Sequence, residues 1–238
     1  MKNIVILAAG IGGRLKPLTD TLPKCCLTIG SETLIGRIIT QLSRASQEFK
    51  IKINIHVVGG FCFEVLRDEI GKLPVPVNLI RNENYLETNN MESCRMALEE
   101  IALLDTVIIN ADCAYDYEIV SKMVTAPISC IATDSSQFFE ENMKVSLKKN
   151  RVVGISKELA NEINNFTSID IYHFLKTDVY DLLKIMQVYN KKGDLKKWNE
   201  VAINELVQIK DINVIDFAGS NWVEIDTLED LQKGRELW

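Results

Sequence analysis

A glycine-rich stretch with two cations, LAAGIGGRLKPLTDTLPK, follows directly on an apolar run near the start of the chain. Gly10, Gly12 and Gly13 allow close backbone approach to an anion and present bare N–H groups to it. Arg14 can hold phosphate oxygens in a bidentate fork, and Lys24 supplies a point charge. These residues predict a phosphate-binding loop. The alternative is a tight turn between two solvated cations.

Neither of the two commonest phosphate loops fits this stretch. The dinucleotide fingerprint G-x-G-x-x-G, counted from Gly10, needs a glycine where Leu15 stands. The ATPase-type loop needs Gly-Lys-Ser or Gly-Lys-Thr after a glycine, and the stretch contains neither. A different class of nucleotide-binding loop is therefore indicated.

Two aspartates follow strand-like runs. Asp112 comes after VIINA and Asp226 after WVEI. Since Mg²⁺ binds through one or two carboxylates plus substrate phosphates, Asp112 is predicted to hold a metal, the alternative being a helix N-cap. Asp116 is the better acid for the first turn of the next helix. Thr227 resembles a capping-box start for the last helix, which leaves Asp226 at a strand end with either role open.

An asparagine-rich loop precedes another helix-like segment. It contains Asn82, Asn84, Thr88, Asn89 and Asn90. Amide groups offer both a donor and an acceptor, as the edge of cytosine or uracil requires. The alternative is a polar turn in which Asn89 or Asn90 caps the helix.

Strand-like and helical patterns alternate through the first half. The spacing predicts strands at 3–8, 52–58, 75–80 and 106–110, and helices at 34–42, 63–70, 91–103 and 115–123. This alternation predicts an α/β fold: a Rossmann-like mixed, mostly parallel sheet with helices on both faces. Right-handed crossovers would place the carboxyl ends of the strands, where ligands bind, along one rim.

The second half is less regular and predicts a small β elaboration. We expect strands at 128–133, 144–148, 151–155, 168–174, 214–217 and 222–225, and helices at 179–189, 199–207 and from 228. No linker-like composition divides the chain. The expected organisation is a single domain, 1–238, with a nucleotide-binding half up to about 125 and an acceptor-binding half from about 126.

Composition narrows the classes of function. The net charge is −6 and 25% of the 238 residues are charged, values that argue against disorder and against a general nucleic-acid binder. No apolar run is long enough for a membrane span, so a cytoplasmic protein without membrane association is expected. The six cysteines form no C-x-x-C pair and are expected to be buried thiols.

The first stretch resembles the signature of the nucleotidyltransferase family that makes activated sugars and phospho-alcohols, L-A-A-G-x-G-x-R-[LF]-x-P-L-T-x-x-x-P-K. The match runs in register from Leu7 to Lys24. The resemblance implies that this loop wraps a nucleoside triphosphate, while Arg14 and Lys24 stabilise charge as pyrophosphate leaves. It also implies that Asp226 joins Asp112 on Mg²⁺, with Glu224 a weaker candidate.

The resemblance also suggests the remaining site residues. The nucleotide-binding set would comprise Leu7, Ala8, Ala9, Gly10, Gly12, Gly13, Asn82, Thr88, Asn89, Asn90, Ser93 and Ala111. Lys144 would reach the acceptor phosphate, although a lysine there could equally be a solvated edge residue. Asp170, Trp198, Glu200 and Trp222 would border the acceptor pocket, and the tryptophans could instead be ordinary packing.

The pattern T-N-N-x-x-S, from Thr88 to Ser93, resembles the cytidylyltransferase branch that loads phosphocholine and related phospho-amino compounds. The chain departs from that branch at Glu92 and Cys94, where apolar residues are more usual. The expected activity is transfer of CMP from CTP to a small phosphorylated acceptor. The alternatives are a sugar-1-phosphate nucleotidyltransferase using UTP, dTTP or GTP, and a non-catalytic nucleotide sensor. A homodimer is compatible with the sequence.

Overall fold

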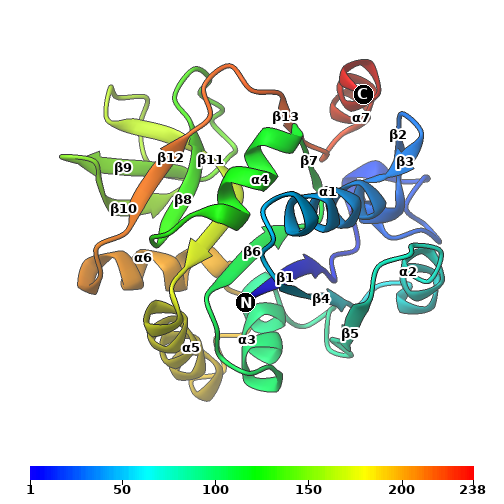
Figure 1. Cartoon of the computed structure of the whole chain (residues 1–238), viewed down its shortest axis with the longest axis horizontal. Helices are drawn as coiled ribbons and strands as arrows, with labels where there is room; N and C mark the ends of the chain where they lie inside the picture. Colours follow the sequence, from blue (N-terminus) through cyan, green and yellow to red (C-terminus); the bar gives the residue numbers. More distant parts are fainter.

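A mixed sheet of nine strands runs through the middle of the computed structural model, which describes all 238 residues (Figure 1). The strand order is β5-β4-β1-β6-β11-β8-β12-β10-β9. The bounds are β1 Lys2–Ala8, β4 Ile53–Gly59, β5 Val77–Arg81, β6 Thr106–Asn110, β8 Cys130–Asp134, β9 Lys144–Lys148, β10 Arg151–Ser156, β11 Asn165–Phe174 and β12 Asn213–Asp216.

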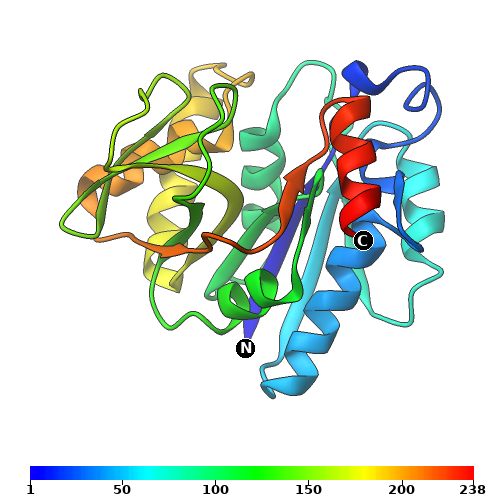
Figure 2. The same ribbon diagram turned by 90° about the horizontal axis from the view of Figure 1, so that it is seen from above.

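Helices cover both faces of this sheet, as Figure 2 shows from above. Their bounds are α1 Leu34–Glu48, α2 Phe63–Ile70, α3 Asn90–Glu100, α4 Tyr117–Thr125, α5 Lys176–Lys191, α6 Asn199–Ile209 and α7 Leu228–Leu237. In β1, Ile4 and Ile6 pack into the core beneath α1, α2 and α4. Val5 and Leu7 point to the opposite face and pack into the core beneath α3, α5 and α6. Because successive side chains alternate between faces, a strand covered on both sides needs a continuous apolar run, and β1 has one from Ile4 to Ala8.

The predicted α/β fold class, with helices on both faces, is confirmed. β5, β4, β1 and β6 are parallel neighbours, as are β8 and β12, and strand order reverses at β1. β11 then runs antiparallel to both β6 and β8 and joins the second half to the first. β9 and β10, at the strands predicted for 144–148 and 151–155, form an antiparallel hairpin that continues the same sheet.

The helix predicted at 115–123 begins two residues later than expected, because a short strand precedes it. This strand, β7 Cys113–Tyr115, pairs antiparallel with β13 Trp222–Glu224. The Ile225 N–H also donates to the Asp112 carbonyl at 2.9 Å. This pairing brings two segments more than a hundred residues apart into register, and Asp226 beside Asp112.

Several predicted element bounds also shift. α1 runs on to Glu48, since Ala45 continues its buried face, and α3 ends at Glu100 rather than 103. The small hairpin of β2 Thr28–Ile29 and β3 Glu32–Thr33 was not predicted. The capping box of Thr227 and Asp230 is present at the start of α7.

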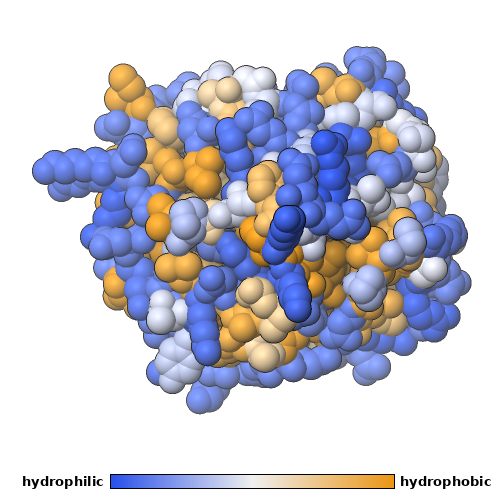
Figure 3. Space-filling view, in the orientation of Figure 1, coloured by the Kyte–Doolittle hydropathy of each residue, from blue (hydrophilic) through white to orange (hydrophobic).

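The face of the molecule drawn in Figure 3 is mainly hydrophilic. On the face drawn in Figure 3, apolar residues form scattered patches among polar ones. No helix combines the length and the apolar character that crossing a membrane would need.

Candidate active site at the rim of the parallel strands

A cavity of about 490 Å³ lies at the carboxyl ends of β1 and β6. Leu7 of β1 and Asn110 of β6 are register partners, and both line it. β1 is the strand at which strand order reverses, the position where open α/β sheets bind ligands. The cavity is thus placed as the sequence predicted.

Most of the predicted site residues line this cavity. They are Leu7, Ala9, Gly10, Gly12, Gly13, Arg14, Lys24, Asn82, Thr88, Asn89, Asn90, Ser93, Asp112, Asp170, Trp198, Glu200 and Asp226. Ala8 and Ala111 line a smaller cavity that shares Leu7, Gly10, Gly12, Lys24 and Asp112 with the first.

The glycine-rich loop leaves β1 and makes a tight turn at Gly12, which has a φ of +67°. A Cβ at Gly12 would lie 3.0 Å from the Lys24 Cβ and 3.3 Å from the Thr19 Cγ2. The Thr19 hydroxyl donates to the Gly12 carbonyl at 2.7 Å. Glycine is therefore required at this position both by its backbone conformation and by the close approach of Lys24.

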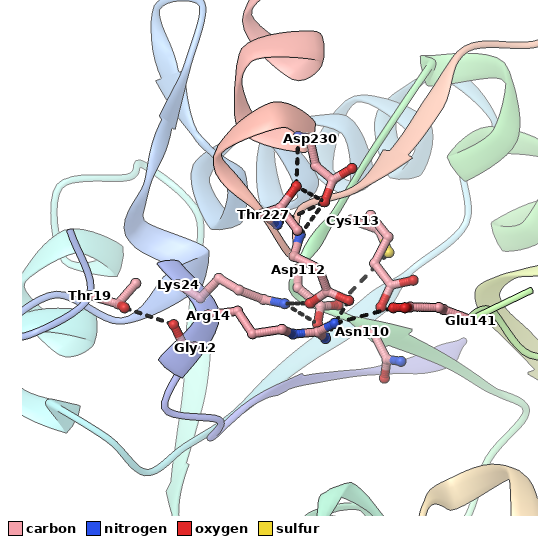
Figure 4. Close-up of polar contacts among 12 residues, drawn as sticks. Gly12, Arg14, Thr19, Lys24, Asn110, Asp112, Cys113, Glu141, Thr227 and Asp230 are labelled. Atoms are coloured by element: carbon pink, nitrogen blue, oxygen red, sulfur yellow. Dashed lines mark hydrogen bonds and ion pairs between the residues drawn. The ribbon is translucent and has the colours of Figure 1, made fainter. Parts of the chain in front are cut away.

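Lys24 and Arg14 point at the carboxylates, as Figure 4 shows for Lys24, Arg14 and Asp112. The Lys24 Nζ lies 2.9 Å from Asp112 Oδ2 and 2.7 Å from Asp226 Oδ1. Arg14 contacts the other oxygen of Asp226 at 2.6 Å. The structure thus brings together the two cations and the two aspartates predicted from separate parts of the sequence.

Glu224 completes a group of three carboxylates with Asp112 and Asp226, whose oxygens all lie within 4.8 Å of one another. Oxygen ligands of this kind suit a hard divalent cation such as Mg²⁺. Burial, together with the charges of Asp170, Asp112 and Asp226, raises the pKa of Glu224 to about 9. Burial also acts to raise the pKa of Asp226, but the charges of Lys24 and Arg14 outweigh it and hold that pKa below its usual value.

The asparagine-rich loop leads into α3, and several of its polar side chains form hydrogen bonds within the loop itself. Asn82 donates to the hydroxyls of Thr88 and Ser93, both at 3.0 Å, and its Oδ1 accepts from the Asn84 N–H. Asn89 caps α3, its Oδ1 accepting from the Asn90 N–H at 2.8 Å. The side chain of Asn82 therefore shapes the loop.

The half-buried Asp170 and the buried Glu200 meet at one tyrosine in the cavity. The Tyr172 hydroxyl lies 3.0 Å from Asp170 Oδ1 and 2.8 Å from Glu200 Oε1. Burial raises the pKa of Glu200, and burial with the charges of Glu200 and Asp112 raises that of Asp170 to about 7. Because one hydroxyl hydrogen cannot serve both carboxylates, the pair favours holding an extra proton.

The backbone at Asp170 is itself unusual. Its φ is +60°, and the pairing of β11 with β8 breaks register between Ser168 and Tyr172. Non-glycine residues in this region carry backbone strain that the surrounding structure must offset. Asn110 donates to Asp170 Oδ2 at 3.1 Å and helps to hold the carboxylate at the cavity.

Two predictions for the acceptor side are corrected by the structure. Lys144 does not line the cavity: it is buried, and its ammonium donates to the carbonyls of Glu140 and Lys157. Trp222 is also buried, and its Nε1 donates to Asp134 at 2.8 Å instead of facing the cavity. Both side chains stabilise the walls, since each satisfies polar groups that burial would otherwise leave without partners.

The cavity contains residues that the sequence prediction missed or ranked low. They are Tyr85, Asn110, Asn142, Met143, Lys157 and Glu224. Lys157 is the exposed cation among them, with its Nζ 4.9 Å from the centre of the Trp198 ring. It follows β10 directly, and a lysine at the end of a strand was a signal available in the sequence.

Comparison with known proteins places the chain in a family. Residues 3–136, more than half of the chain, match the nucleotidyl transferase family. The chain is 34% identical over 110 residues to a 2-aminoethylphosphonate cytidylyltransferase of Lancefieldella rimae, which covers 46% of this chain and 42% of the relative. It is 33% identical over 130 residues to the CTP:phosphoglutamine cytidylyltransferase of Campylobacter jejuni, covering 52% and 49%. The matched part thus spans about half the length of these relatives, or less.

A solved structure shares the fold over almost the whole chain. The CTP:phosphocholine cytidylyltransferase of Streptococcus pneumoniae superposes with a TM-score of 0.80 over 99% of this chain and 98% of that one, at 20% identity. The signature loop, the two cations and the facing aspartates occupy the rim where the sequence placed them. The chain belongs to the nucleotidyl transferase family.

Proposed function

We propose that the protein transfers CMP from CTP to a small phosphorylated acceptor that carries a positively charged amino or ammonium group, releasing pyrophosphate. The observation that carries this proposal is the pair Asp170 and Glu200. Both line the cavity, and neither forms an ion pair with a cationic side chain. Two carboxyl groups at one wall suit a ligand that supplies its own positive charge, because buried charges need partners.

The names of the relatives support a CTP-using enzyme with such an acceptor. Phosphocholine, 2-aminoethylphosphonate and phosphoglutamine each combine a phosphorus oxyanion with a nitrogen-containing group, and all three occur in names of related cytidylyltransferases. We extend this shared chemistry to the present chain as part of the proposal.

The proposed reaction is an in-line displacement. An acceptor phosphate oxygen attacks the α-phosphorus of CTP, and the bond from that phosphorus to the oxygen bridging to the β-phosphate breaks, so that pyrophosphate leaves with the electron pair. No general base is required, since the attacking phosphate is already anionic at pH 7. Arg14 and Lys24 stabilise the negative charge that grows on the leaving group.

The carboxylates of Asp112, Asp226 and Glu224 fit a Mg²⁺ ion by their chemistry and their spacing. Such an ion would neutralise phosphate charge and orient the triphosphate. Lys24 already bridges two of these carboxylates, so the residues that hold the metal also fix the cation beside it.

The experiment that tests the proposal is a substrate panel. The purified protein is incubated with Mg²⁺, one of CTP, UTP, dTTP or GTP, and one of phosphocholine, phosphoethanolamine, 2-aminoethylphosphonate or a sugar 1-phosphate, with pyrophosphate as the readout. Release with CTP and a cationic acceptor supports the proposal. Release only with UTP and a sugar phosphate would identify a sugar nucleotidyltransferase, and nucleotide binding without release for any pair would identify a sensor.

The two lysines near the acceptor wall should respond differently to substitution. Lys144→Ala should lower the free energy of unfolding by about 1–3 kcal/mol, because it leaves the carbonyls of Glu140 and Lys157 without their donor. Lys157→Ala should leave stability unchanged and lower kcat/KM for the acceptor by roughly 10–100-fold, because it removes an exposed cation from the cavity wall. Urea unfolding and steady-state kinetics measure the two effects. If Lys144→Ala were as stable as the wild type but had a lower kcat/KM for the acceptor, Lys144 would have the acceptor-binding role predicted from the sequence.

The affinity for a cationic acceptor should fall in acid. Burial and the charges of Glu200 and Asp112 raise the pKa of Asp170 to about 7. Binding a cation favours the ionised pair, so below that pKa the pair must first release a proton. The KM for the acceptor should therefore rise by about tenfold for each unit by which the pH falls. The acceptor phosphate also titrates near pH 6, so Asp170→Asn serves as the control and should keep only that part of the profile. Identical pH profiles for the two proteins would contradict the assignment.

A further inference from the structure

The start of α6 is capped by a residue from another helix. Trp198 occupies the N-cap position but makes no capping hydrogen bond with its side chain. The first backbone N–H groups of a helix lack partners within the helix. At α6 the Asn90 Oδ1, at the beginning of α3, accepts from the Asn199 N–H at 2.8 Å.

This contact is the centre of a longer seam between the two segments. The Asn89 N–H donates to the Leu195 carbonyl at 2.9 Å. Asn190, near the end of α5, donates to the Glu92 carboxylate at 3.1 Å, and Arg95 holds the same carboxylate. The beginning of α3 thus fixes the loop that enters α6.

Both sides of the seam face the same cavity. Asn90 lines it from α3, while Trp198 and Glu200 line it from α6. Asn199 lies between these two and is fully buried. Glu200 in turn contacts Tyr172 of the carboxyl pair at 2.8 Å. The position of the Asn199 backbone therefore sets the position of the adjoining Glu200 carboxylate.

The amide of Asn90 has a fixed orientation. The Asn199 N–H requires an oxygen acceptor, so the Oδ1 faces α6 and the Nδ2 group lies on the other edge of the planar amide. No group within the protein accepts from this Nδ2 at hydrogen-bond distance. A nucleotide oxygen or ring nitrogen that accepts from it would immobilise the whole amide plane, and with it the contact to Asn199.

We propose that Asn90 is a positioning residue that couples nucleotide binding to the acceptor wall, by capping α6 through the Asn199 N–H. The inference rests on the proposed function, because it assigns the nucleotide to the α3 side and the acceptor to Glu200. Coupling of this kind is reciprocal: if the nucleotide orders the start of α6, the acceptor strengthens nucleotide binding by the same factor.

A matched pair of variants isolates this hydrogen bond without altering Asn90. Asn199→Pro removes the donated N–H. Proline is favoured at the first position of a helix, and the preceding Trp198 has φ −74° and ψ 152°, which suit a residue before proline. Asn199→Ala removes the same side chain but keeps the N–H. Comparing the two separates loss of the cap from loss of the buried amide.

The first measurement is hydrogen exchange with and without Mg²⁺ and CTP. In the wild type and in Asn199→Ala, CTP should slow exchange at the amides of α3 and at residues 200–206 of α6. In Asn199→Pro, slowing should persist in α3 and be lost in α6. Slowing at α6 in Asn199→Pro equal to that in Asn199→Ala would overturn the proposal, as would a wild type in which α3 responds and α6 does not.

The second measurement is kinetic. With the acceptor identified by the substrate panel, Asn199→Pro should raise acceptor KM by about threefold to tenfold relative to Asn199→Ala, with kcat within twofold. Equal acceptor KM values would overturn the coupling. Failure of the proposed function is distinct from either result: no protection of α3 by CTP, UTP, dTTP or GTP would remove the nucleotide assignment itself.

Discussion

Asp226→Asn should lower the rate of pyrophosphate release from CTP by roughly 10²–10³-fold or more while leaving the protein folded. The Asp226 carboxylate contacts Lys24 with one oxygen and Arg14 with the other, and it belongs to the three-carboxylate group. The amide keeps the shape but loses the charge that fixes both cations and completes the proposed Mg²⁺ site. Asp112→Asn should have a similar effect, because Lys24 bridges the two residues.

The fold should survive these substitutions for identifiable reasons. The Ile225 N–H bonds to the Asp112 carbonyl, and the Thr227–Asp230 capping box does not use the Asp226 carboxylate. Asp211→Asn is a suitable control, since that side chain is largely exposed and pairs with Arg151, and neither residue lines the cavity. Circular dichroism and urea unfolding check the fold, and a pyrophosphate assay checks turnover. Undiminished turnover in both active-site variants would refute the two-aspartate site.

Replacing the acidic pair should change which acceptors are used. The double variant Asp170→Asn, Glu200→Gln should lower kcat/KM for a cationic acceptor by roughly 10²–10³-fold, as loss of buried charge partners does at interfaces. The change for a matched neutral acceptor, such as a simple alkyl phosphate, should be below tenfold. The quantity to compare is the ratio of the change in kcat/KM for the cationic acceptor to that for the neutral acceptor, because any general damage to the site affects both equally.

The same double variant should be more stable than the wild type near pH 8. The pKa of Asp170 is raised in the folded protein to about 7, above its unfolded value of 3.8. The folded state therefore binds the proton more tightly, and the stability this gives is complete below pH 3.8 and is lost as the pH rises through 7. The neutral amides of the double variant do not titrate, so the variant does not lose this stability as the pH rises. In the kinetic comparison, an equal loss of kcat/KM for cationic and neutral acceptors would show that the pair supports the fold rather than selecting the charge of the acceptor.

The first half of the molecule could be predicted well because local signals and global topology agree there. Alternating apolar strands and amphipathic helices define parallel α/β units, and the topology then places Gly10, Arg14 and Asp112 on one rim. Lys24 also follows, since the signature fixes its distance from the glycines along the chain. The meeting of Asp226 with Asp112 could be expected only from the family resemblance, because the β7–β13 pairing that produces it is too short to leave a clear pattern.

The acceptor side was harder to predict because residue type does not reveal side-chain direction there. Lys144 and Lys157 are both lysines at strand ends, yet one is buried on two carbonyls and the other is exposed at the cavity. Likewise, Trp198 faces the cavity and Trp222 packs away from it. In each case tertiary packing decides the outcome, and an irregular β segment carries little periodicity from which to infer it.

β11, the antiparallel strand between β6 and β8, has a consequence for how the protein can diversify. The loop residues proposed to hold the triphosphate come from the first half, whereas Lys157, Asp170 and Glu200 come from segments joined to it through this strand. Residues 3–136, which match the family, exclude all three. Under the proposed function, substitutions beyond β8 should therefore change which acceptor is used while the glycine-rich loop stays intact.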